Sequence, residues 1–150
     1  MAAGKKQQFV FKGETRDDSI LIGSHGDATV VIDGNFDLSG IVYCPKYTLT
    51  VSVSGTGIVA FRGIANRVVI KKMSGDCTLD LRDLTCKELR CESARKKSRI
   101  LSGKTRVVSK ATLYDEAILQ FSDRPLITSS LVSGNAQIIQ GSSDVILSQR

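Results

Sequence analysis

Tryptophan is missing from this sequence, and only 5% of its 150 residues are aromatic. Proline is also scarce, with two residues, whereas glycine occurs thirteen times. This balance favours repeated β-turns and aliphatic strands over a fold of long helices. The longest apolar runs, such as Ile41-Val42-Tyr43-Cys44, contain only a few residues, whereas a membrane-spanning helix needs about 20. We therefore expect no integral membrane segment.

The sequence has a single histidine, His25, about 19 residues before the nearest cysteine, Cys44. The other cysteines are Cys77, Cys86 and Cys91, and no two of the four have CxxC spacing. Zinc sites normally need such paired ligands, so we expect no metal, no cofactor and four reduced thiols that pack as small apolar side chains. The acidic residues lie mostly beside turns, and the short repeats leave no room for cleft-building loops. We therefore expect no catalytic residues and no enzymatic activity.

The N-terminal residues 1–8 form a short polar, basic tail, and we expect one domain from residue 9 to residue 150. No apolar run of the length that a signal peptide requires follows the tail. The sequence therefore predicts a cytoplasmic protein if this N-terminus is native, and an exported one if a signal peptide has been removed.

A turn-plus-strand pattern recurs about every 20 residues along the whole chain. We anchor each repeat on the small or turn-forming residue that follows a strand. The anchors are Gly13, Gly34, Gly55, Gly75, Ala94, Asp115 and Gly134, with successive spacings of 21, 21, 20, 19, 21 and 19. Glycine suits a corner where φ is positive or where a Cβ has no room. Self-similarity at a fixed period is the signature of a repeat architecture.

Apolar residues hold fixed positions relative to these anchors. Two residues before the anchor are Phe11, Ile32, Val53, Met73, Leu113 and Val132; four after it are Leu38, Val59, Leu79, Leu119 and Ile138; six after it are Phe61, Leu81, Ile100 and Phe121. Between them, apolar and polar residues alternate with period two, which indicates strands. The sequence therefore predicts an all-β fold, a single-stranded right-handed parallel β-helix of about seven coils.

The competing fold is an antiparallel sandwich or barrel, which predicts no fixed register. The fifth coil fits the β-helix least well, because Glu92 takes the apolar position two residues before Ala94. Moving that anchor to Ser93 would restore an apolar residue, Cys91, at this position. Lys71 also falls on a nominally inward position of its coil.

Residues 47–141 resemble the GIN-type domain, an autotransporter adhesin head family. That family repeats a unit of valine or isoleucine, serine, glycine, a small residue and glycine once per coil. The matching segments are Leu49-Thr50-Val51-Ser52-Val53-Ser54-Gly55-Thr56-Gly57, Met73-Ser74-Gly75-Asp76, and Pro125-Leu126-Ile127-Thr128-Ser129-Ser130-Leu131-Val132-Ser133-Gly134-Asn135-Ala136. The second glycine of the unit is present only as Gly57, and the family's usual signal peptide is not visible. The resemblance implies a β-helical fold and a role in adhesion.

Positive charge is concentrated in the central coils. Residues 62–110 contain 14 Lys and Arg against 5 Asp and Glu, a local balance of +9, whereas the whole chain has a net charge of +6. Because residues one coil apart stack in a β-helix, these cations can form a basic face that attracts an anionic polymer. The candidate anion-binding residues are Lys71, Lys72, Arg95, Lys96, Lys97, Arg99, Lys104 and Arg106.

The function that the sequence favours is a non-enzymatic structural or interaction module, adhesin-like or self-associating. A β-helix exposes unpaired strand edges at its first and last coils, so we expect a homo-oligomer formed through coil ends or an outer face. Binding of an acidic polysaccharide or a nucleic acid through the basic coils is the alternative. A polymer-forming scaffold similar to bactofilin, a cytoplasmic β-helix, is a further one.

Overall fold

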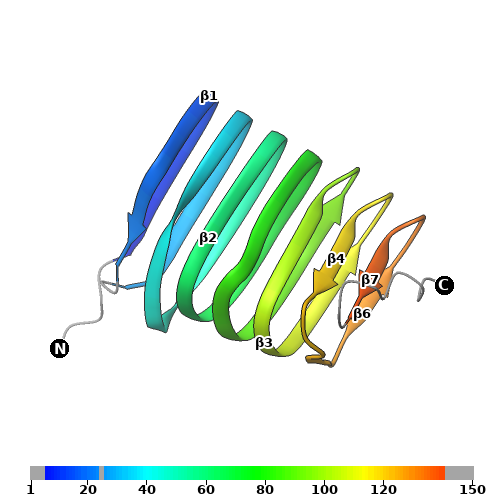
Figure 1. Ribbon diagram of the computed structural model, residues 1–150. Coiled ribbons are helices and arrows are strands. Elements are labelled where there is room, and N and C mark those ends of the chain that lie inside the picture. Colours follow the sequence, from blue (N-terminus) through cyan, green and yellow to red (C-terminus); the bar gives the residue numbers. More distant parts are fainter. Residues whose placement is uncertain (1–5, 24–25, 141–150) are drawn as a thin grey trace.

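A computed structural model describes residues 6–23 and 26–140 and contains no helix within them (Figure 1). The strands are β1 (Gln7–Ile22), β2 (Ala28–Arg95), β3 (Arg99–Leu113), β4 (Ile118–Phe121), β5 (Leu126–Ile127), β6 (Ser130–Val132) and β7 (Gln137–Ile139). β2 is 68 residues long and winds through several coils, so strand labels and coils do not coincide. β1 begins at Gln7, two residues before the expected start of the domain.

Every pairing between these strands is parallel, and partners lie about one coil apart in the sequence. Gln7 pairs with Ala28 and Thr78 with Arg99, both at a separation of 21, whereas Ile100 pairs with Leu119 at 19. The chain forms a stack of about seven coils with a period of about 20 residues (Figure 1). The predicted β-solenoid is therefore confirmed, and the antiparallel sandwich or barrel is excluded.

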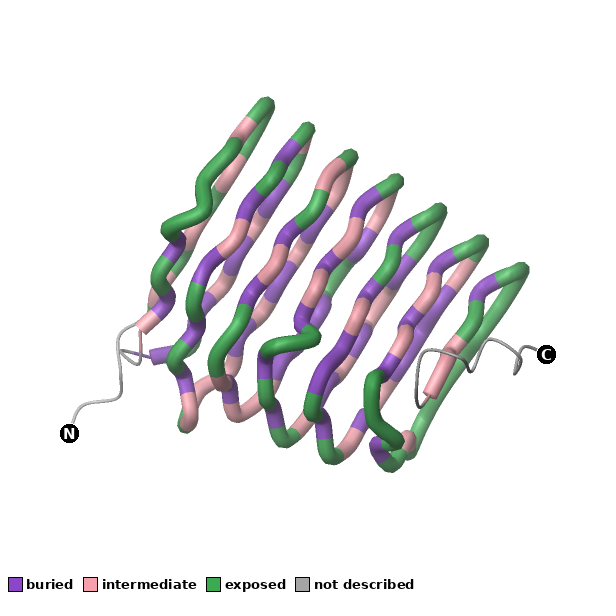
Figure 2. Tube along the Cα trace, in the orientation of Figure 1, coloured by how far each residue is buried: buried purple, intermediate pink, exposed green. Residues whose placement is uncertain are grey.

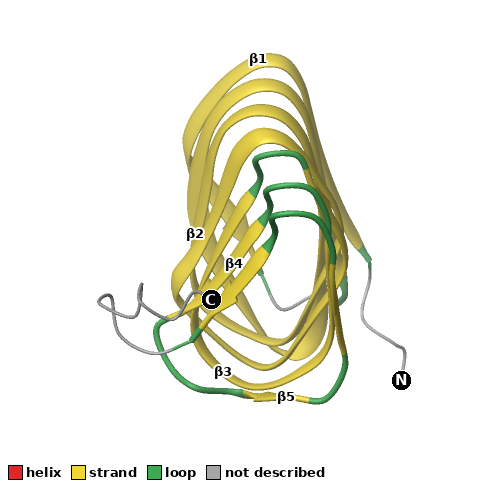
Figure 3. Cartoon of the chain, turned by 90° about the vertical axis from the view of Figure 1, so that its right-hand side faces the viewer, coloured by secondary structure: helices red, strands yellow, loops and turns green. Residues whose placement is uncertain are grey.

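Each coil has an elongated cross-section with two long sides (Figure 3). We call the side that runs into the anchor corner the leading side, for example 49–53, and the side that leaves it the trailing side, for example 57–65. Buried and exposed residues alternate along both sides, and buried positions line up from coil to coil (Figure 2). The coils thus share one continuous core, which no single coil can form alone.

The anchor corner is a column of residues with positive φ. Gly34, Gly55 and Gly75 have φ values of 125°, 119° and 113°. A Cβ on any of these three would collide with the backbone of the glycine one coil earlier. Glycine is therefore required here by both backbone conformation and space.

The fifth anchor is Lys96, so the predicted anchors Ala94 and Ser93 are wrong. Lys96 has φ 61°, and Asp115 above it has φ 59°. Its backbone N–H donates to Asp115 Oδ2 at 2.9 Å, and its carbonyl accepts from Glu116 N–H at 3.0 Å. Ala94 is fully buried, because it lies two residues before the true corner. The corrected spacings are 21, 21, 20, 21, 19 and 19.

With this correction the two inward ladders beside the corner continue through the fifth coil, although its pairing shifts register farther along both long sides. Ala94 pairs with Leu113 in the ladder two residues before the corner, and Ile100 pairs with Leu119 in the ladder four residues after it. All four side chains are 0% exposed. Ile100 therefore does not belong six residues after the anchor; buried Ser102 occupies that position.

Lys71 does not face the core, because two outward residues instead of one separate the inward positions next to the corner of its coil. In the third coil the inward Val51 and Val53 are two residues apart, but in the fourth coil the inward Ile70 and Met73 are three apart. Lys71 and Lys72 between them are both exposed. The additional outward residue has the effect of a β-bulge: both lysines point outward, and Met73 is buried again before the corner.

Candidate functional site

All eight basic residues that the sequence singles out are exposed, but the structure distributes them over three parts of the coil. Lys71 and Lys72 lie on the leading side, Arg95, Lys96, Lys97 and Arg99 at or beside the anchor corner, and Lys104 and Arg106 on the trailing side. They are thus not brought together on one face.

At the anchor corner, the lysines lie among carboxylates. Lys96 and Lys97 line an open hollow of about 400 Å³ together with Asp76, Asp115 and Glu116. Three acidic residues therefore offset two lysines in this hollow. Since Coulomb attraction for a bound anion depends on the summed charge, this corner is a poor anion site.

On the leading side, one carboxylate holds two cations. Glu92 Oε2 lies 2.6 Å from Arg90 Nε, and Glu92 Oε1 lies 3.5 Å from Lys110 Nζ. The hydrogen bond from Arg90 is the main reason that the pKa of Glu92 lies below its usual value. Because the carboxylate is only partly buried, this network is worth little to stability.

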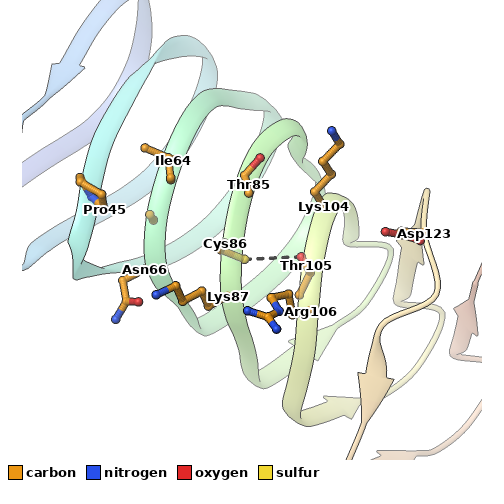
Figure 4. A pocket seen from close by; sticks show the side chains of 11 residues that line it. Pro45, Ile64, Asn66, Thr85, Cys86, Lys87, Lys104, Thr105, Arg106 and Asp123 are labelled. Carbon is orange, nitrogen blue, oxygen red and sulfur yellow. Dashed lines mark hydrogen bonds between the residues drawn. The ribbon is translucent and has the colours of Figure 1, made fainter.

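The trailing side contains a groove of about 380 Å³ that crosses several coils (Figure 4). We call it the axial groove, because its walls are two rows of outward residues that follow the stack. One wall is formed by Ile64, Thr85 and Lys104, and the other by Pro45, Asn66, Lys87 and Arg106, while Asp123 lies at the C-terminal end. Strand register places Thr85 beside Lys104.

The floor between these walls is formed by residues whose side chains point into the core, among them Cys86 and Thr105. Cys86 pairs with Thr105 in the ladder, and Cys86 Sγ lies 3.4 Å from Thr105 Oγ1. Thr105 Oγ1 also lies 2.9 Å from Ser102 Oγ. Since these buried polar atoms satisfy one another, the floor is fixed without help from a ligand.

Three cations of the groove are available to a ligand. Lys87, Lys104 and Arg106 are exposed, and none of them takes part in the four ion pairs formed between described residues. Glu88, next to Lys87, is engaged elsewhere: it lies 3.3 Å from Arg67 Nε and accepts a 2.6 Å hydrogen bond from Ser109 Oγ. The groove is thus positive at its middle coils.

Sequence reasoning found Lys104 and Arg106 but missed Lys87, Asn66 and Thr85. The signal that points to them is the coil spacing itself: Lys87 lies 21 residues after Asn66 and 19 before Arg106. The pairing of Cys86 with Thr105 and of Glu88 with Val107 places Lys87 beside Arg106, after a register shift between Leu81 and Thr85.

The four cysteines are free and buried, as expected of packing residues. Burial raises the pKa of Cys77 to about 11 and that of Cys91 to about 12, from an ordinary value of 9.0. A nucleophilic cysteine needs the opposite shift, because the thiolate is the reactive form.

These raised pKa values predict a loss of stability at alkaline pH. The folded state keeps its thiol protons while the unfolded chain loses them, so stability is complete below pH 9 and falls as the pH rises toward 11 to 12. For Cys91 alone, we expect the free energy of unfolding to be roughly 1 kcal/mol lower at pH 10 than at pH 8. Urea unfolding at both values measures the difference, and Cys91→Ala should reduce it. An identical difference in that variant would contradict the assignment.

Within residues 6–23 and 26–140, no three His, Cys, Asp or Glu residues are grouped as metal ligands. His25 lies outside the described residues. No helix of the described chain has the length and apolarity to cross a membrane. Comparisons with protein-family models, curated proteins and solved structures found no match to this chain.

Proposed function

We propose that this protein is a non-enzymatic interaction module that associates with further copies of itself by stacking coil on coil. The observation that carries the proposal is the state of the core at the two ends of the stack. Apolar side chains that belong to the interior ladders are only partly buried in both end coils. A second copy stacked on either end would complete their burial.

At the N-terminal end, Phe9 and Phe11 of β1 pack against the core but stay partly exposed. Their ladder partners in β2, Val30 and Ile32, are at most 1% exposed. Among the described strands, β1 pairs only with β2 and ends the sheet. Its 16 residues therefore present a long strand edge, the kind of surface that pairs with another chain.

At the C-terminal end, the described strands β5, β6 and β7 pair only with the coil before them. Ile127 and Ile138 pack against the core while partly exposed. Leu131 and Val132 of β6 are 54% and 43% exposed, respectively. This end thus offers the same combination of strand edge and apolar ladder.

The two ends are complementary because the ladders share one register. Val132 and Phe11 both occupy the position two residues before a corner, so a second copy would place them one coil apart, with Gly13 above Gly134. Such a head-to-tail contact uses two different surfaces and does not close on itself. It would build linear assemblies. The GIN-type resemblance implies adhesion, which is likewise a non-enzymatic function that depends on binding through a repeated surface.

The test is the concentration dependence of assembly. We expect the sedimentation coefficient of the full chain to rise with protein concentration, and Phe9→Lys to weaken association by about tenfold or more, because it removes the burial of a phenyl ring. Val10→Lys is the matched control, since Val10 is in the same strand and 50% exposed.

Thermal unfolding followed by circular dichroism shows whether Phe9→Lys has kept its fold, and Phe9→Ala provides a milder variant. A wild-type chain that stays monomeric over a wide concentration range overturns the proposal. So does a Val10→Lys variant that weakens association as much as Phe9→Lys does.

A further inference from the structure

We propose that the axial groove is a binding site for an acidic polysaccharide, a chain of sugars that carry carboxylate or sulfate groups. The inference does not rest on self-association, because the groove lies on the trailing side and not at a coil end. Three properties of the groove support it: its course across several coils, its positive charge and the polar, non-aromatic side chains of its walls.

The groove has the shape of a site for an extended chain. Its lining residues come from several successive coils, from Pro45 at one end to Asp123 at the other (Figure 4). Neighbouring coils are separated by the strand spacing of about 4.8 Å, which is close to the length of one sugar unit in an extended polysaccharide. A ligand that repeats along its length therefore meets a wall that repeats with a similar step.

The charge of the groove selects an anion. Lys104 and Arg106 project from the fifth coil and Lys87 from the fourth, on the two sides of the floor (Figure 4). Among the described lining residues, Asp123 alone is acidic; it lies one coil beyond Lys104 at the C-terminal end and accepts a 2.8 Å hydrogen bond from the Arg124 backbone N–H. An anionic group over the fourth and fifth coils would meet cations on both walls. Charge-assisted hydrogen bonds of this kind are stronger than neutral ones.

The remaining wall residues suit sugars better than nucleobases. Asn66 and Thr85 bring an amide and a hydroxyl to the groove, which can donate to and accept from sugar hydroxyls. None of the eleven described residues that line it is aromatic. Proteins that bind single-stranded nucleic acids combine a basic groove with aromatic side chains on which the bases stack, and this groove has the positive charge but no such stacking side chain.

The experiment compares anionic ligands of six repeating units on the full chain. Fluorescence anisotropy with labelled hexasaccharides of polygalacturonate and of heparin should show saturable binding, and a six-nucleotide thymidine strand should bind more weakly than either. The two sugar probes separate carboxylate from sulfate recognition. The double variant Lys87→Glu/Arg106→Glu should raise the Kd by at least about tenfold, since charged hydrogen bonds are lost.

A matched control replaces two cations by glutamate outside the groove, so that the net charge changes by the same amount. Lys71→Glu/Lys72→Glu alters the bulge on the leading side, so it should change the Kd far less than the groove variant does. Asn66→Ala/Thr85→Ala should weaken sugar binding without altering the overall charge. Equal losses in the two charge-reversal variants, tighter binding of the thymidine strand, or no binding of either hexasaccharide would overturn the proposal. None of these outcomes depends on whether the protein is monomeric.

Discussion

Gly55→Ala is expected to lower the free energy of unfolding by at least about 3 kcal/mol, a substantial share of the stability of a typical single domain. Gly55 has φ 119°, a conformation that residues with a Cβ adopt only with strain. An alanine Cβ would also collide with the carbonyl oxygen of Gly34 in the preceding coil. Relief of the collision requires the two coils to separate, which breaks their parallel hydrogen bonds. Urea unfolding followed by circular dichroism measures the effect.

Gly13→Ala is the matched control for this result. Gly13 occupies the same corner in the first coil, at the N-terminal end of the stack. Its φ of 79° also disfavours alanine. No heavy atom lies within 4 Å of a Cβ built there, because no described coil precedes it. We expect a loss of only about 1 kcal/mol, from backbone strain alone. Equal losses in the two variants would show that stacking at the corner contributes nothing.

The corner column explains why the fold was predictable from the sequence. A glycine that must sit on another glycine imposes a fixed spacing, and Gly34, Gly55 and Gly75 display that spacing directly. The ladders on both sides then follow from alternation alone, as Val51 and Val53 show. Because the coils stack in parallel, the corner and the alternation beside it recur in every coil. A wrong corner in a single coil therefore does not change the predicted fold.

The two wrong predictions, the fifth corner and the inward position of Lys71, concern backbone conformations that the residue type does not reveal. Lys96 and Asp115 adopt φ values near 60° without being glycine, and the sequence pattern identifies Asp115 as a corner but not Lys96. A bulge at Lys71 changed the phase of alternation by one residue. Both errors lie in the central coils, where the basic residues of interest are.

The candidate site was only partly predictable for the same reason. Charge density correctly pointed to the central coils, but it could not tell which cations share a surface. Lys96 lies among carboxylates contributed by neighbouring coils, Asp76 and Asp115. Lys104 and Arg106, by contrast, lie in a groove whose third cation, Lys87, has an ion-paired neighbour. Which cation is available to a ligand depends on the residues one coil before and after it, and hence on the exact register.

The corrected register makes a second prediction with a large effect, at Ala94. Ala94→Lys should lower the free energy of unfolding by at least about 3 kcal/mol, because it forces an ammonium group into a core without a partner. Ala94 is 0% exposed and pairs with Leu113, which is also 0% exposed. If Ala94 were the corner residue, a lysine there would point into solvent and the variant would be as stable as the parent.

Lys96→Ala is the reciprocal variant. Lys96 is exposed and already adopts φ 61° with a Cβ present, so alanine carries the same backbone strain. We expect its stability to stay within about 0.5 kcal/mol of the parent. If Ala94→Lys is insoluble, Ala94→Val gives a graded test, since one overpacked core position costs about 1 to 3 kcal/mol. A stable Ala94 variant beside a destabilised Lys96→Ala would return the corner to residue 94.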